Sequence, residues 1–273
     1  MPYRAPRYSH LHAAQDVGVA AIDLDGATAL AGFPIDNLID DRQGTVMKLA
    51  AAVSGLNIDI DLGANFVTGI NRLIIPPNHN IDAITIVDDD NAGFATPATL
   101  HALDTGPTPG ALIDIDTFDT GASTQQFIRI TLGTGSKQYF LPQIFLTKVV
   151  TLVVGPNLRR AIDQQSANFA RQIQPSGLSP TVQLGPLQRR LEYLYEAPIE
   201  GADLTALEAL IDAVGMSRPF YLDPASFSAT PAIDDPPISA KFEVMPDVIY
   251  AVDVASTGVR QKAFALSIIE SFD

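Results

Sequence analysis

Cysteine and tryptophan are both absent from the 273-residue chain. Without cysteine there is no disulfide framework, no thiolate nucleophile and no cysteine-based zinc site. Basic residues are scarce as well, with 17 Lys and Arg against 31 Asp and Glu and a net charge of -14. A chain this acidic has no basic field to attract phosphates, so we expect it to bind neither nucleic acid nor anionic lipid.

Long apolar runs are also missing. No stretch reaches the length of about 18 apolar residues that a membrane-spanning helix needs, and residues 1–18 lack the features of a signal peptide. We therefore expect a soluble protein that is made in the cytoplasm and is not inserted in a membrane. With 47% hydrophobic and 18% charged residues the chain is globular, and its length favours two modest domains, with one large β domain as the alternative.

The first half of the chain carries the periodicity of strands. In LNIDIDLG (56–63) the residues Ile58, Ile60 and Leu62 alternate with Asn57, Asp59 and Asp61, which predicts a strand with one buried face. Turn-rich segments separate further strands, which we expect at residues 70–75, 81–87, 111–118, 126–132 and 141–154. This spacing predicts an all-β sandwich over residues 32–150, preceded by an N-terminal arm or edge (1–31).

The second half, residues 151–273, shows a different residue pattern. Alternation of Leu191, Tyr193 and Tyr195 predicts a strand, and strands are also expected around residues 218–224, 241–245 and 260–272. Helical spacing of apolar residues predicts a short helix at about 204–214, with Thr205 and Glu208 as a capping box and Gly215 at its end. The fold class is mainly β: an N-terminal jelly-roll β-sandwich followed by a β domain with one short α-helix.

Candidate catalytic residues are few. The four histidines, His10, His12, His79 and His101, show neither metalloprotease spacing nor a nearby nucleophile motif. The segment GTGSK (133–137) resembles part of a phosphate loop, but it opens no helix and is better explained as a hairpin turn. We assign no catalytic residue and no cofactor, and expect that the protein is not an enzyme.

Two acidic clusters, DNLIDD (36–41) and DDDNAG (88–93), could offer oxygens to calcium or form solvated turns; neither matches an EF-hand loop. The pairs Asp59/Asp61 and Asp114/Asp116 could serve as glycosidase carboxylates or mark solvent-facing sides of strands. Only Tyr139 among the tyrosines falls in the sandwich, so a sugar site built on stacking is hard to assemble. We assign no metal site, and the ligand-binding residues are left unassigned.

Residues 32–154 resemble the galactose-binding-like, discoidin-type jelly-roll as it occurs in bacteriophage structural proteins. The resemblance rests on NLIDD (37–41), DLG (61–63) and the turn NHN (78–80), followed by QFIRITL and QIFL. The sequence departs from the family pattern in two features. The usual glycine of the turn is missing, and the tryptophan expected near Thr45 is also missing, since Val46, Met47 and Lys48 follow Thr45.

Residues 149–273 resemble the belt domain of distal-tail-type phage proteins. That resemblance rests on an arginine-rich strand beginning at Arg189, the helix near 204–214 and the segment PFYLDP (219–224). Together the two resemblances imply a virion structural protein of a tailed phage, made in the host cytoplasm and located in the tail tip or baseplate. It would form a homo-oligomeric ring and contact other tail or baseplate proteins, with the arm residues Tyr3, Arg4, Arg7 and Tyr8 suited to an interface.

The alternative is a receptor-binding module whose sandwich loops recognise a carbohydrate on a host surface. It predicts saccharide binding that is lost on changing Asp40 or Asp41. A third class, a glycoside hydrolase, predicts the release of reducing ends, and we expect none.

Overall fold

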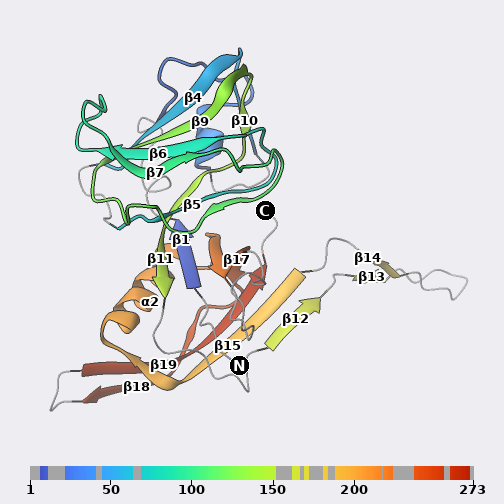
Figure 1. The fold of residues 1–273 in the computed structure, drawn as a ribbon. Helices are drawn as coiled ribbons and strands as arrows, with labels where there is room; N and C mark the ends of the chain where they lie inside the picture. Colours follow the sequence, from blue (N-terminus) through green and yellow to red (C-terminus); the bar gives the residue numbers. More distant parts are fainter. Residues whose placement is uncertain are drawn as a thin grey trace, which may run out of the picture. The chain divides into compact units, whose positions relative to one another are not determined.

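The computed structural model describes residues 7–11, 22–40, 45–63, 69–151, 162–166, 169–171, 181–183, 188–216, 218–223, 237–254 and 259–270. The chain forms two compact units, one built mainly from residues 9–149 and the other from 150–272. We call them the sandwich unit and the helix unit and describe each by itself (Figure 1). Strand β1 (Arg7–Leu11) lies within the part predicted as an arm. Tyr3 and Arg4 lie outside the described residues, and the side chains of Arg7 and Tyr8 are not described.

The sandwich unit contains an antiparallel five-stranded sheet. Its strands follow the order β2 (Ile22–Asp23), β4 (Val53–Asp61), β9 (Phe127–Lys137), β6 (Ile84–Asp89) and β7 (Ala98–Asp104). The central pairing joins β4 to β9, which brings residues about 70 positions apart in the sequence face to face.

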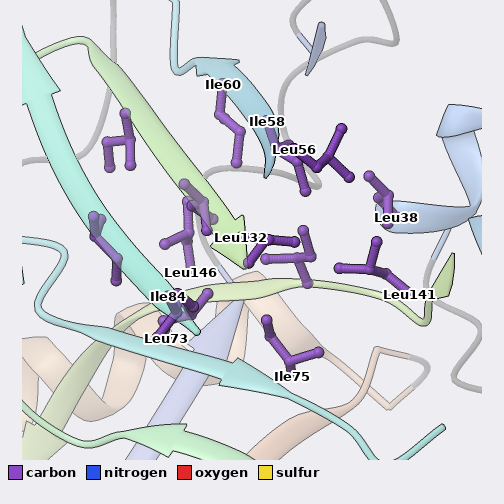
Figure 2. Close-up of a cluster of buried hydrophobic side chains, with 14 of the residues drawn as sticks. Leu38, Leu56, Ile58, Ile60, Leu73, Ile75, Ile84, Leu132, Leu141 and Leu146 are labelled. Carbon is purple, nitrogen blue, oxygen red and sulfur yellow. The ribbon is translucent and has the colours of Figure 1, made fainter. Parts of the chain in front are cut away.

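A second layer of strands lies on the other side of the core. Here β5 (Arg72–Ile75) pairs with both β11 (Phe145–Thr151) and β8 (Ile113–Ile115). Strands β3 (Met47–Lys48) and β10 (Phe140–Leu141) form a small separate ladder, and a 3-10 turn, η2 (Ile35–Leu38), precedes them. Side chains from both layers share one buried cluster, part of which Figure 2 shows. The predicted fold class, a mainly β protein with a β-sandwich, is confirmed.

Strand β4 shows the alternation that its sequence predicts. Leu56, Ile58 and Ile60 are at most 1% exposed and point into the core, and Leu62 follows them at 6%. The intervening Asn57, Asp59 and Asp61 are only half-buried, on the opposite face. One face of β4 therefore builds the sandwich and the other is available for a site.

The structure adds to or corrects the expectations for the sandwich unit at three places. Within residues 1–31, predicted as an arm or edge, β2 forms an edge strand of the five-stranded sheet: Ile22 pairs with Ile60, and Ile22 and Leu24 are buried in the sandwich core. Residues 133–137 are not a hairpin turn but the last part of β9, paired with β4 at Val53. Strand β7 was not predicted, because Leu100 is its only buried side chain and no alternation marks it.

The helix unit is built on two long antiparallel strands, β15 (Gln188–Glu200) and β19 (Val259–Glu270). Strands β12 (Ile162–Ser166), β17 (Ile238–Phe242), β16 (Phe220–Asp223) and β18 (Asp247–Val254) extend this sheet. A separate hairpin pairs β13 (Phe169–Arg171) with β14 (Thr181–Gln183). As predicted, Leu191, Tyr193 and Tyr195 share the buried face of β15.

Helix α2 (Gly201–Val214) packs against β15 and β19. It ends where predicted: Gly215 has φ +54° and its N–H donates to the carbonyl of Ile211 at 2.8 Å. The predicted capping box is wrong. The hydroxyl of Thr205 donates to the carbonyl of Gly201 at 3.1 Å, and Glu208 pairs with Lys262 of β19. No described helix combines the length and the apolar content that crossing a membrane would require.

Candidate functional site

The outer face of the five-stranded sheet carries polar and aromatic side chains in facing positions. Across the β4–β9 pairing, Asp59 lies opposite Arg129 and Asp61 lies opposite Phe127. Strand β2 adds Asp23 beside Asp59. Because residues on one face recur every second position, this pairing gathers the acids of β4, the arginine and phenylalanine of β9 and the acid of β2 in one place.

Arg129 is the centre of this face. Its Nε and Nη2 donate hydrogen bonds of 2.6 Å to the two carboxylate oxygens of Asp59, and Nη2 lies 3.6 Å from Oδ2 of Asp25. These hydrogen bonds to Asp59 raise the pKa of Arg129, so the guanidinium is charged at any physiological pH. The guanidinium carbon stands 4.4 Å from the centroid of the Phe94 ring, a cation–π contact.

Phe94 is positioned by the loop between β6 and β7. Asp89 accepts hydrogen bonds from the N–H of Asn91 (3.1 Å) and of Thr96 (2.9 Å), and the side chain of Asn91 accepts one from Gly93 (2.8 Å). These bonds hold Phe94 at φ +48°, a conformation that costs free energy for a side chain of this size. The loop is thus braced to place an aromatic ring under Arg129.

The remaining carboxylates are each oriented by hydrogen bonds. Oδ1 of Asp23 accepts from the N–H of Asp25 at 2.7 Å, and Oδ2 of Asp25 accepts from Asn57 at 2.8 Å. Oδ1 of Asp61 accepts from both Gly63 N and Gln126 Nε2, each at 2.7 Å. Among the described residues no hydrogen bond reaches Oδ2 of Asp23, Oδ1 of Asp25 or Oδ2 of Asp61. Three acceptor oxygens are therefore available to a ligand.

These side chains line a pocket of about 490 Å³. Its wall is made by Asp23, Asp25, Gly26, Asp59, Ile60, Asp61, Ala92, Gly93, Phe94, Phe127 and Arg129. Phe127 is half-buried and presents aromatic surface, whereas Phe94 is only 9% exposed. The pocket combines fixed hydrogen-bond acceptors with one aromatic wall, which suits a small polar ligand that carries several donors.

The described part of the acidic loop, residues 36–40, does not line this pocket. Asn37 donates to the carbonyl of Val46 at 2.7 Å, and both carboxylate oxygens of Asp40 accept from the hydroxyl of Thr45 at 3.0 and 2.8 Å. Leu38 is fully buried, so the loop anchors the chain to the core. Asp41 lies outside the described residues.

The second acidic cluster also has a structural role. Asp88 is buried and accepts from the hydroxyl of Ser123 at 2.7 Å, and Asp89 organises the β6–β7 loop. Within the part of the chain that the structure describes, no group of three or more His, Asp or Glu side chains is placed to hold a metal ion. The calcium interpretation of both clusters therefore finds no geometric support there.

The two carboxylate pairs have different surroundings. Asp59 has both oxygens bonded to Arg129, and Asp114 makes a similar two-point contact with the buried Arg72, at 2.8 and 2.7 Å. Asp116 lies 3.7 Å from the same guanidinium. Asp59, Asp114 and Asp116 therefore lie against arginine, whereas Asp61 accepts hydrogen bonds from Gln126 and Gly63.

Two of the four histidines can be placed. His79 is 2% exposed; its Nδ1 accepts from the N–H of Ile81 at 3.1 Å, so the proton resides on Nε2, which donates to the carbonyl of Ala111 at 2.6 Å. Nδ1 of His101 lies 3.2 Å from Asp119, away from the pocket residues. The side chain of His10 and all of His12 lie outside the description.

Sequence analysis missed Arg129, Phe127 and Phe94 as site residues. A signal for the first two exists in QFIRITL, where Phe127, Arg129 and Thr131 alternate with apolar residues just as the acids of β4 do. Opposite charge at facing positions could have suggested the pairing of these strands. Phe94 has no such signal, because a loop places it.

No known family model matches the chain, and no curated protein matches it in sequence. Solved structures to which the chain is similar include chitosan-binding module 1 of a chitosanase/glucanase from Paenibacillus sp. IK-5, at 23% identity and a TM-score of 0.37, covering 50% of this chain and 98% of that one. They also include a GH29 fucosidase of Ruminococcus gnavus, at 20% identity and a TM-score of 0.38, covering 50% and 26%. The CBM32 of AlyQ, at 24% and 0.31, covers 45% and 93%. The similarity to each spans about half of this chain.

Proposed function

We propose that the sandwich unit is a carbohydrate-binding module and that the sugar occupies the pocket around Arg129. The observation that carries this proposal is the pocket itself, where oriented carboxylates converge beside the half-buried ring of Phe127. Sugar hydroxyls donate hydrogen bonds to carboxylate oxygens, and the C–H face of a sugar ring packs on aromatic surface. The pocket supplies both kinds of contact.

We further propose that binding occurs without catalysis. A glycosidase needs one carboxylic acid and one carboxylate placed on either side of the bond that is cleaved. In this pocket Asp59 is held by Arg129, and Asp61 is held by Gln126 and Gly63. Such fixed, paired carboxylates suit recognition, so we expect no release of reducing ends from any bound saccharide.

The test is a titration of the full chain against a panel of oligosaccharides, followed by isothermal calorimetry. Phe127→Ala removes the aromatic wall and should weaken binding by about tenfold or more, as expected for a loss of roughly 1.4 kcal/mol. Phe33→Ala is the matched control, because Phe33 is a half-buried phenylalanine of the same unit that packs under Lys48, away from the pocket. Absence of binding to every saccharide, or equal loss in the two variants, would contradict the proposal.

A second candidate function is that of a structural subunit in the tail tip or baseplate of a tailed phage, made in the host cytoplasm and assembled into a homo-oligomeric ring. The observation that favours it is a set of exposed apolar side chains in the helix unit: Met216 is 49% exposed, Val244 53% and Met245 52%. Exposed apolar side chains are suited to burial against other subunits.

This second candidate is tested by mass photometry and electron microscopy of the purified chain across concentration. Ring-shaped oligomers should form and should be lost in the double variant Val244→Glu/Met245→Glu. Leu103→Glu, at a side chain 59% exposed in the sandwich unit, is the control and should leave the oligomers intact. A chain that is monomeric at every concentration would exclude self-assembly into a ring.

A further inference from the structure

We propose that the pocket around Arg129 selects a saccharide that carries a protonated amino group, and rejects sugars that carry a carboxylate. This inference rests on the proposed carbohydrate-binding function and adds the chemical class of the ligand.

The pocket wall carries an excess of negative charge. Among its described lining residues are four carboxylates, those of Asp23, Asp25, Asp59 and Asp61, and one guanidinium, that of Arg129, which together carry a formal charge of -3. No lysine is among the lining residues that the structure describes. A neutral sugar can donate hydrogen bonds to these carboxylates but carries no net charge, whereas an ammonium group is also attracted by the excess of negative charge and a carboxylate is repelled.

The guanidinium of Arg129 is already paired with a carboxylate of the wall. Nε and Nη2, the two donors on the side edge of the Arg129 guanidinium, already form a bidentate pair with Asp59. The ring of Phe94 stands 4.4 Å from the guanidinium carbon, and Asp25 lies 3.6 Å from Nη2. A sugar carboxylate would have to displace Asp59 to form the same pair, which would leave that acid without its partner.

Three carboxylates of the wall are held in place and still have an acceptor oxygen to offer. Each of Asp23, Asp25 and Asp61 has one oxygen fixed by a hydrogen bond from the chain, at 2.7 to 2.8 Å, and a second oxygen that accepts none from the described residues. An ammonium group carries three donors and no acceptor. The wall therefore offers fixed charge and open acceptor positions to the kind of group that has only donors.

The experiment compares three probes of one length on the full chain by calorimetry: a glucosamine hexamer, an N-acetylglucosamine hexamer and a galacturonic acid hexamer. We expect the glucosamine hexamer to bind at least tenfold more tightly than the N-acetylated one, with the preference shrinking as salt is raised, and the uronate hexamer to bind most weakly.

The test variant is Asp23→Asn/Asp25→Asn/Asp61→Asn. Asparagine keeps an oxygen that can accept each existing hydrogen bond, and it tolerates the positive φ of +48° at position 25, so the fold should be preserved while the formal charge of the wall falls to zero. Binding of the glucosamine hexamer should weaken by about fivefold for each carboxylate removed, whereas binding of the N-acetylated hexamer should change little. Asp212→Asn, at an exposed helix position in the other unit, is the control.

The outcomes separate the two proposals. Equal binding of the glucosamine and N-acetylglucosamine hexamers, or a preference that survives in the triple variant, would overturn the amino-sugar inference and leave carbohydrate binding standing. A lack of binding to all three probes, and to the wider panel, would overturn both. A preference for the amine that disappears only in the triple variant supports the inference.

Discussion

The guanidinium of Arg129 in β9 and the carboxylate of Asp59 in β4 lie directly opposite each other and share two hydrogen bonds of 2.6 Å. Their side chains are 22% and 20% exposed, so this is a partly buried, two-point ion pair that joins the two central strands of the sheet. The pair stabilises the sheet as a cross-strand contact, and it also forms the polar floor of the pocket.

Weakening this pair should lower stability as well as change the pocket. Asp59→Asn places an amide N–H₂ against one donor of the guanidinium and should cost about 1–2 kcal/mol in the free energy of unfolding. Urea denaturation measures the loss. Asp212→Asn makes the same chemical change on the exposed face of α2 and should alter stability by no more than about 0.5 kcal/mol. Equal effects of the two substitutions would show that the pair contributes nothing.

Gly133 is required by both its backbone and its neighbour. It has φ +69°, and a Cβ built there would lie 2.0 Å from the hydroxyl of Tyr139, whose side chain is fully buried. Gly133→Ala should therefore cost about 3 kcal/mol or more, combining backbone strain with overpacking. Gly32→Ala, at φ +85° with nothing within 4 Å, should show the strain alone.

A double variant separates the two causes. Because the closest contact is with the hydroxyl, Tyr139→Phe should recover part of the loss in the Gly133→Ala background, although it removes the 3.3 Å hydrogen bond to the carbonyl of Gly135 in the native chain. A double-mutant cycle by thermal denaturation should give a favourable coupling free energy. Strictly additive effects would contradict the steric explanation.

His79 should make the protein less stable in mild acid. Burial lowers the pKa of His79 in the folded chain, against the opposing effect of its hydrogen bond to Ala111, and protonation of Nδ1 would break the bond from Ile81. Since the folded pKa lies below the unfolded value of about 6.5, the unfolded chain takes up the proton first, and stability declines as pH falls below about 6.5.

The effect of His79 is measured as the difference in the pH dependence of stability between the native chain and His79→Gln. Urea denaturation from pH 7.5 to 5 should show a steeper loss for the native chain than for His79→Gln, which can donate to Ala111 but does not titrate. The many acids of the chain contribute to both slopes and cancel in the comparison. Parallel slopes would show that His79 does not titrate in this range.

The two units have separate buried clusters, one that includes Ile58 and one that includes Leu207. Ile58→Ala and Leu207→Ala each remove a fully buried side chain and should cost about 2–5 kcal/mol in the unit that holds it. Calorimetry should show each substitution lowering the melting temperature of a different transition. A single transition moved equally by both would indicate that the units unfold together.

The elements that could be predicted from the sequence are those with several buried side chains. Strand β4 was predicted because Ile58 and Ile60 alternate with acids, and α2 because Leu204, Leu207 and Leu210 recur at helical spacing; all five are buried. Strand β7 has one buried side chain, Leu100, so its sequence carries almost no periodic signal. An element with a buried face has a periodic pattern of apolar residues, and an element without a buried face has no such pattern to detect.

The site was harder to predict than the fold. Asp59 was recognised as solvent-facing, but its partner Arg129 is 70 residues away, and strand pairing rather than local sequence brings the two together. Phe94 depends on a loop that Asp89 and Asn91 shape through backbone hydrogen bonds. Such long-range pairing and loop geometry leave little trace in a single sequence.

The irregular step in β4 limits how this protein can change in length. Gly55, at φ +79°, lies where the pairing of β4 with β9 shifts between Ser54 and Leu56. From Leu56 onward, inserting or deleting one residue would turn Asp59 and Asp61 into the core and Ile58 and Ile60 out to the pocket. Related chains that keep this pocket should therefore vary in loop length but preserve the length of β4 after Gly55. The same alternation of residues along β4 places one set of side chains in the core and the other set at the pocket.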